Sequence, residues 1–392
     1  MKKILAIALA LVMVFALAAC GGPPEQATTP PPVAPGPADP PPATDPPGGQ
    51  EAPPPAPGTD GTEIILITDL GTIDDRSFNQ GSWEGVVKYA QEFGKSYDYI
   101  QPAEQGDDTY LNAIDLAVQM GAKVIVTPGF LFEYPIYVAQ DTYPNVSFIL
   151  IDGAPNNGDW DNFHAHTAPN TVGVLYAEEQ AGFLAGYGAV MAGYTELGFM
   201  GGMAVPAVIR FGHGFIQGAE LAAQELGLGD GEVSLNYYYT GVFWPLPEIN
   251  TMASAWYNDG VEVIFACGGA ISDSIFPAAA QAGKFVIGVD VDQSNLSPTV
   301  ITSAMKGLTQ SVYDKLADFF NGNFPGGQVI TYSAANLGVG LPMANSKLGS
   351  FGQADYDAIF ARLVNGSVKV DDDIGIAPDA IPTVKVAVNN LG

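Results

Sequence analysis

The side chains best suited to chemistry in this sequence stand in a short acidic stretch near its first apolar strand. Asp69, Asp74 and Asp75 follow the β-branched run Ile64–Ile67, and Phe78 comes just after them. Such carboxylates offer hydrogen-bond acceptors to a ligand or, with a metal, could form the acid–base cluster of a hydrolase. Phe78 either contacts that ligand or packs in the core.

Few other residues compete with this stretch. Asp290 follows the apolar run Phe285–Val289 and is a second candidate ligand contact. His164 and His166 lack the carboxylate partners of a usual metal site, so a surface loop explains them better and we predict no metal. Neither a P-loop nor a G-x-G-x-x-G motif is present, so we predict neither a phosphate cradle nor a cofactor.

The elements around the acidic stretch explain its placement. Ile64–Ile67 has the short apolar pattern of a parallel strand that is buried on both faces. Val86 and Tyr89 belong to a helical pattern that follows, and Ser77 or Asp75 can cap this helix. A polar loop therefore lies at the carboxyl end of the first strand, where α/β folds bind their ligands.

The alternation of strand and helix continues along the chain and predicts parallel sheets with right-handed crossovers. Further strands are expected at Tyr97–Ile100, Val124–Val126, Ser147–Ile151, Leu197–Met200, Val233–Tyr239, Val261–Ala266, Phe285–Val289 and Val300–Ala304. Further helices are expected at Asp107–Met120, Leu131–Asp141, Val174–Met191, Pro206–Leu226, Glu248–Asn258, Ser272–Ala282, Gln310–Asn321 and Tyr356–Leu363. About 330 residues are too many for one ordinary core, so we expect two lobes whose strand-end clusters line one cleft.

The N-terminal residues have the composition of a targeting segment and a tether. Residues 1–19 carry two lysines and the apolar run Ile4–Ala19, which is typical of a secretory signal and short for a membrane-spanning helix. A small residue before Cys20 resembles the lipobox of bacterial lipoproteins, which implies cleavage there and acylation of the thiol. Residues 20–61 hold 16 of the 31 prolines and predict a disordered, semi-stiff spacer.

The charge and the cysteines exclude several classes of function. The net charge of −28 repels phosphate backbones, so we predict no binding of nucleic acid. The same charge opposes binding to an anionic membrane surface, so attachment must depend on the lipid. Cys267 is the only cysteine besides Cys20, which rules out a disulfide or a cysteine metal site in the lipidated chain, and its apolar surroundings predict a core residue.

Five segments stand out in order along the chain. They are Asp74–Gly85, Gly129–Phe132, Glu179–Tyr187, Gly288–Gln293 and Thr302–Lys306. Together they resemble the basic membrane lipoproteins, the purine-nucleoside receptor type of solute-binding protein. Several ordered motifs over residues 63–306 are much more specific than any one of them.

The resemblance implies a type I periplasmic-binding-protein fold, with two Rossmann-like lobes and a hinge of three crossovers. It places the N-terminal lobe in residues 62–168 plus about 300–325, and the C-terminal lobe in residues 169–299 plus about 326–392. It also implies a lipid-anchored, extracytoplasmic monomer that is not an enzyme. Such a protein closes its cleft on a purine nucleoside and delivers it to an ABC permease.

Site residues follow from the same resemblance. Asp69 would bond the purine, and Phe78 would stack on it. Asp290 and Lys306 would take the ribose hydroxyls, which suit bidentate, charge-assisted hydrogen bonds. From the first motif we also include Asp75 and Asn79.

The sequence departs from the family at Val242–Pro247, where the family usually has a small, polar turn. For the second stacking aromatic that the resemblance implies in the opposite lobe, the best match is Phe243, with Trp244 beside it, and the glycine it implies after a second-lobe strand matches Gly268 or Gly269. Two other functions stay open. The same lobes could present a ligand to a receptor or regulator, and the acidic stretch could belong to a nucleoside hydrolase.

Overall fold

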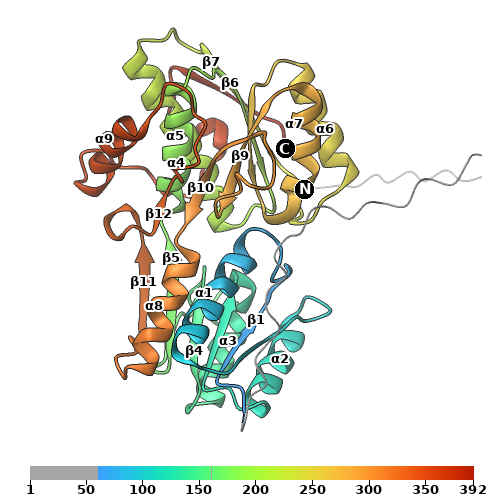
Figure 1. Ribbon diagram of the computed structural model, residues 1–392, viewed down its shortest axis with the longest axis vertical. Helices are drawn as coiled ribbons and strands as arrows, with labels where there is room; N and C mark the ends of the chain where they lie inside the picture. Colours follow the sequence, from blue (N-terminus) through green and yellow to red (C-terminus); the bar gives the residue numbers. More distant parts are fainter. Residues whose placement is uncertain (1–60, 160) are drawn as a thin grey trace, which may run out of the picture. The chain divides into compact units, whose positions relative to one another are not determined.

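The computed structural model describes residues 61–159 and 161–392, and all of these pack into one unit. The predicted signal peptide, Cys20 and nearly all of the predicted tether lie outside the described residues. Two sheets with helices against their faces make up the described part (Figure 1). Within it, no helix combines the length and the apolar character that crossing a membrane requires.

The first sheet has the strand order β11-β5-β4-β3-β1-β2, and every neighbouring pair is parallel. Its strands are β1 (Ile64–Ile67), β2 (Tyr97–Ile100), β3 (Val124–Pro128), β4 (Ser147–Ile151), β5 (Thr171–Tyr176) and β11 (Gln328–Tyr332). Its helices are α1 (Phe78–Phe93), α2 (Asp107–Gln119), α3 (Glu133–Thr142) and α8 (Leu308–Phe320), with α1 and α8 side by side (Figure 1). All four residues of β1 are buried, as expected for a strand between two helical layers.

The second sheet has the order β12-β10-β9-β8-β6-β7-β13 and is parallel except for the pair β10–β12. Its strands are β6 (Glu196–Gly201), β7 (Val233–Tyr239), β8 (Val263–Cys267), β9 (Phe285–Asp290), β10 (Val300–Lys306), β12 (Val339–Gly340) and β13 (Val386–Asn390). Its helices are α4 (Glu178–Met191), α5 (Pro206–Leu226), α6 (Pro247–Asn258), α7 (Ser272–Ala282) and α9 (Gln353–Val364). The Cys267 thiol is buried in β8, as predicted.

Three crossovers join the two lobes. The chain passes from β5 to α4, from β10 to α8, and from β11 to β12. The crossovers are tied together, because Ala177 N–H donates to the carbonyl of Tyr332 at 2.8 Å and Gly307 N–H donates to the carbonyl of Gly338 at 2.8 Å. Backbone hydrogen bonds therefore link the third crossover to each of the other two.

The predicted lobe boundaries are wrong at three strands. β5 pairs with β4, so the first crossover follows Tyr176 rather than residue 168, and the predicted helix Val174–Met191 begins only at Glu178. Buried Val172 and Val174 alternate in a strand before the Gly- and Ala-rich helix starts. β10 pairs with β9 in the second sheet, and β11 pairs with β5 in the first.

Helices α4 and α5 touch backbone to backbone. A Cβ atom on Gly182 or Gly186 of α4 would overlap the carbonyl oxygen of Phe211 or Phe215 on α5, respectively. Gly218 of α5 would meet α4 in the same way. Glycine is required here because only its bare Cα lets two helices approach so closely. The contact fixes the register in which the first turns of these helices face each other.

We expect Leu337→Gly to stabilise the protein by about 0.5–1 kcal/mol. Leu337 lies in the crossover from β11 to β12 with φ +59°, a left-handed conformation that costs free energy in a residue with a Cβ. Its side chain is 79% exposed, so little packing is lost. Urea denaturation measures the change. Leu337→Ala is the control, because it keeps the strain, and a less stable glycine variant would contradict the interpretation.

Candidate functional site

The two sheets place equivalent loops at their carboxyl ends. The order β2-β1-β3-β4-β5 in the first sheet matches the order β7-β6-β8-β9-β10 in the second. Asp152 follows β4 and Asp290 ends β9, so the two carboxylates occupy equivalent places. Both have a left-handed backbone, with φ +59° and +66°, which is uncommon in residues other than glycine and is concentrated at functional sites.

Asp75 organises the start of α1. Its carboxylate accepts hydrogen bonds from the backbone N–H groups of Ser77, Asn79 and Gln80, at 2.9–3.0 Å. It also accepts from the side-chain amide of Asn79 at 3.0 Å. Burial raises the pKa of Asp75 to about 6 against these four donors. Asp75 therefore acts on the helix terminus, as a cap does.

Two neighbours of Asp69 hold its carboxylate through Oδ1. Its Oδ1 accepts from Gly71 N–H at 3.1 Å and from the Asn79 amide at 3.0 Å. Its Oδ2 faces Gly129, where a Cβ atom would lie only 2.5 Å away. Burial raises the pKa of Asp69. The Asn79 amide thus links Asp69 to Asp75, while Oδ2 keeps its acceptor capacity.

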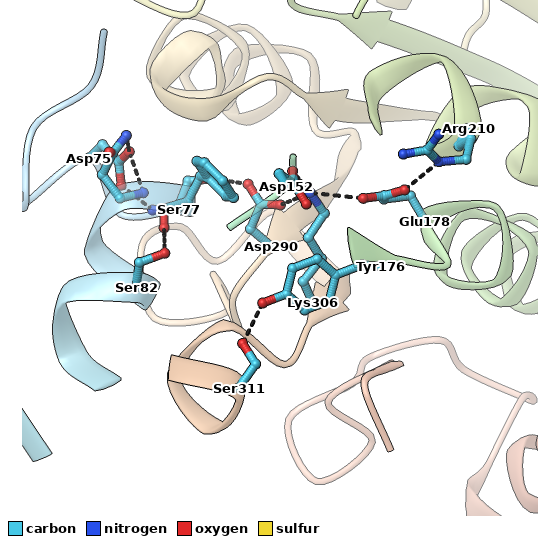
Figure 2. Close-up of polar contacts among 12 residues, drawn as sticks. Asp75, Ser77, Ser82, Asp152, Tyr176, Glu178, Arg210, Asp290, Lys306 and Ser311 are labelled. Atoms are coloured by element: carbon cyan, nitrogen blue, oxygen red, sulfur yellow. Dashed lines mark hydrogen bonds and ion pairs between the residues drawn. The ribbon is translucent and has the colours of Figure 1, made fainter. Parts of the chain in front are cut away.

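Lys306 lies at the centre of a buried group of charges that draws on both lobes (Figure 2). Its Nζ donates to Asp152 Oδ2, lies 3.3 Å from Glu178 Oε1 and lies 4.0 Å from Asp290 Oδ1. Arg210 Nε donates to the other oxygen of Glu178 at 2.6 Å. We call these five residues the Lys306 cluster.

The Lys306 cluster has three carboxylates and two cations, so its charges do not cancel. Burial raises the pKa of Asp152 to about 7 even though Lys306 lies against it, and burial also raises the pKa of Asp290. Burial opposes ionisation of Glu178 as well, but Lys306 and Arg210 outweigh it and lower the pKa of that residue. Asp152 Oδ1 is buried without a hydrogen-bond partner, so it can accept one from a ligand.

Aromatic rings from both lobes surround Lys306. Lys306 Nζ lies 5.1 Å from the ring centroid of Phe78, 5.4 Å from that of Tyr176 and 5.4 Å from that of Phe211. The Tyr176 hydroxyl shares a hydrogen bond with Ser311 (Figure 2). Phe78 thus lies beside Lys306, as a residue of a shared site would.

Phe243 belongs to a separate turn of the second lobe. Its carbonyl accepts from Ala270 N–H at 3.0 Å, and its ring lies where a Cβ on Gly202 would stand. A Cβ atom on Gly268 would lie 2.7 Å from the Cα atom of Gly202, and Gly269 lies beside the Phe243 backbone. The structure therefore brings Phe243 and both predicted glycines together, whereas the side chain of Trp244, the alternative aromatic, is 47% exposed.

Sequence reasoning missed Asp152, Glu178 and Arg210. Asp152 could have been found, because it follows a buried strand just as Asp69 follows β1. In the described part of the chain, no three His, Cys, Asp or Glu side chains are grouped so that they could hold a metal. His164 instead shares a hydrogen bond of 3.0 Å with the Tyr137 hydroxyl.

Comparisons with known proteins identify a family for this chain. The family model described as "ABC transporter substrate-binding protein PnrA-like" matches residues 62–372. The "ABC transporter nucleoside-binding protein BmpA" of Lactococcus lactis is 28% identical over 319 residues, covering 74% of this chain and 86% of its own. "Basic membrane protein A1" of Borrelia garinii is 28% identical over 316 residues, covering 79% and 88%.

Solved structures share the fold. An ABC transporter solute-binding protein from Aeropyrum pernix superposes with a TM-score of 0.68 at 23% identity, covering 80% of this chain and 94% of that one. Another from Conexibacter woesei gives 0.62 at 22% identity, covering 79% and 99%. The predicted type I periplasmic-binding-protein fold is confirmed.

Proposed function

Because this chain belongs to the family of PnrA-like ABC transporter substrate-binding proteins, we propose that it captures purine nucleosides between its two lobes and delivers them to a membrane permease. The observation that carries the proposal is the Lys306 cluster, in which a buried cation joins carboxylates from the carboxyl ends of both sheets. Buried charges are costly and are usual at binding sites. The name of the Lactococcus relative supports a nucleoside as ligand.

Each part of a nucleoside has a chemical counterpart among these residues. Asp69 Oδ2 accepts from the base edge, because its other oxygen is already occupied. Phe78 and Phe243 offer rings to the two faces of the base, and such stacking contributes about 1–3 kcal/mol per base in nucleic-acid complexes. Asp290 and Lys306 bind the ribose hydroxyls through charge-assisted hydrogen bonds.

Charge sets the expected selectivity. The Lys306 cluster and Asp69 together carry more carboxylates than cations, so a phosphate group would enter an unfavourable field. We expect adenosine, inosine or guanosine to bind more tightly than AMP. Isothermal titration calorimetry with each compound tests this. Tighter binding of AMP than of adenosine would overturn the selectivity, and no heat with any nucleoside would overturn the proposed ligand.

Attachment to the membrane completes the proposal. Cys20 follows a signal-like segment and would carry the lipid that holds the protein on the extracytoplasmic face of the cell membrane. Metabolic labelling with a palmitate analogue should mark the wild-type chain and leave Cys20→Ala unmarked. Equal labelling of the two chains would place the lipid elsewhere.

A further inference from the structure

The side chain of Gln293, at the end of the motif Gly288–Gln293, is not part of the proposed site. This side chain is fully buried, and its Oε1 accepts a hydrogen bond from Val289 N–H at 3.2 Å. The backbone N–H of Gln293 donates to Ser303 Oγ at 3.1 Å. Because Oε1 must face an N–H group, the orientation of the amide is fixed and its Nε2 can only donate. The Gln293 side chain is therefore held in the orientation in which its Nε2 can donate a hydrogen bond from the second lobe.

The partner of this donor is a strained turn of the first lobe. Gln293 Nε2 donates to the carbonyl oxygen of Arg76 at 2.9 Å, and Arg76 has a left-handed backbone with φ +57°. The next residue, Ser77, donates from Oγ to Asp290 Oδ2 at 2.6 Å. Strain of this kind persists only where the surroundings hold it, and it is concentrated at ligand clamps and switch regions.

A third contact between the lobes at the same turn is an exposed ion pair. Arg76 Nη1 lies 3.5 Å from Asp273 Oδ1, and these side chains are 55% and 42% exposed. Exposed ion pairs contribute little and are screened by salt. The part-buried bond from Gln293 is worth more, because its donor side chain is fully buried and water competes with it less.

The turn borders an open groove. A cavity of about 440 Å³ runs between α1 and residues 290–296, and Arg76, Asp290 and Lys306 line part of it. Water in this groove can satisfy the Arg76 carbonyl once the lobes part, so the bond can break and re-form without leaving a buried orphan group. The hydrogen bond from Gln293 Nε2 to the Arg76 carbonyl can thus hold the lobes together and release them, and we call it the latch.

We propose, on the basis of the proposed function, that Gln293 is a positioning residue that holds the Arg76–Ser77 turn against the second lobe and so sets how long a nucleoside stays in the cleft. Phe78 follows this turn directly and starts α1. Holding the turn therefore holds the stacking ring in place. Gln293 itself does not touch the ligand.

Gln293→Met tests the latch with a side chain of similar length that cannot donate. Stopped-flow fluorescence with inosine should show dissociation about tenfold faster, as expected for the loss of one part-buried hydrogen bond, with the association rate unchanged. Asp273→Asn should change dissociation less than twofold at physiological salt. An unchanged dissociation rate in Gln293→Met would overturn the proposal.

Ser303→Ala is the matched control for folding. It removes the acceptor of the Gln293 backbone N–H and leaves the bond to Arg76 intact. Its dissociation rate should equal that of the wild type even if the protein is less stable. A rate as fast as that of Gln293→Met would show that lobe stability, and not the latch, governs release.

A readout without ligand separates this inference from the proposed function. Hydrogen–deuterium exchange of a peptide covering residues 74–82 should be faster in Gln293→Met than in the wild type, and unchanged in Ser303→Ala. If no nucleoside binds, the proposed function fails while the exchange rates still decide the latch. Equal exchange in wild type and Gln293→Met would overturn it.

Discussion

Replacing Lys306 by methionine is expected to abolish nucleoside binding and to lower the free energy of unfolding by about 3–5 kcal/mol at pH 8. Methionine has a similar length but leaves Asp152, Glu178 and Asp290 without their shared cation. Arg210 remains beside Glu178, so it balances the charge of that carboxylate only. Calorimetric titration with inosine and urea denaturation measure the two effects.

The loss of stability should depend on pH with a defined sign. Burial already raises the pKa of Asp152 to about 7, and removal of Lys306 raises the pKa values of Asp152 and Asp290 further. The folded variant then binds more protons than the unfolded chain, so its stability is recovered as the pH falls through these pKa values. We expect the difference between variant and wild type to shrink from pH 8 to pH 5.

Lys123→Met is the matched control for this substitution. Lys123 pairs with Glu63 at 2.7 Å, but its side chain is 59% exposed. Its loss should therefore cost less than about 1 kcal/mol and should leave inosine binding unchanged. If the two substitutions cost the same, the Lys306 cluster would have no special energetic role.

The sequence predicted the frame of this site because its strongest signals are local. The buried run Ile64–Ile67, the acidic loop and the helix after it are all present, and Asp290 ends its strand as expected. These features need only periodicity and turn chemistry, which act over a few residues. The predicted strands and helices before residue 322 agree with the structure, apart from Val174–Met191.

The missed residues depend on contacts that are distant in sequence. Glu178 and Arg210 lie 32 positions apart and meet only because α4 and α5 touch. The sequence does not predict β5 as a strand, because β5 contains a glycine and is followed directly by a Gly- and Ala-rich helix. Both features weaken the strand pattern. The strands β11 and β12 pair with elements far upstream, so no local pattern marks which lobe they join.

Gly186→Ala on α4 is expected to lower the free energy of unfolding by about 3 kcal/mol, although alanine favours helices by about 1 kcal/mol over glycine. The new methyl group would overlap the Phe215 carbonyl oxygen, and a backbone atom cannot turn aside as a side chain can. The helices must then separate. Because Glu178 begins α4 and Arg210 lies in the first turns of α5, their 2.6 Å hydrogen bond should lengthen and inosine binding should weaken.

Gly188→Ala tests this explanation on the same helix. A methyl group there would lie 3.0–3.3 Å from the side chains of Leu348 and Phe351, which can shift. We expect a change within about 1 kcal/mol and unaltered binding, because the better helix propensity offsets the small rearrangement. Urea denaturation followed by tryptophan fluorescence compares the two variants. Equal losses of unfolding free energy in the two variants would mean that helix propensity or general crowding sets the response, rather than backbone contact between α4 and α5. The register of Glu178 and Arg210 would then need another cause.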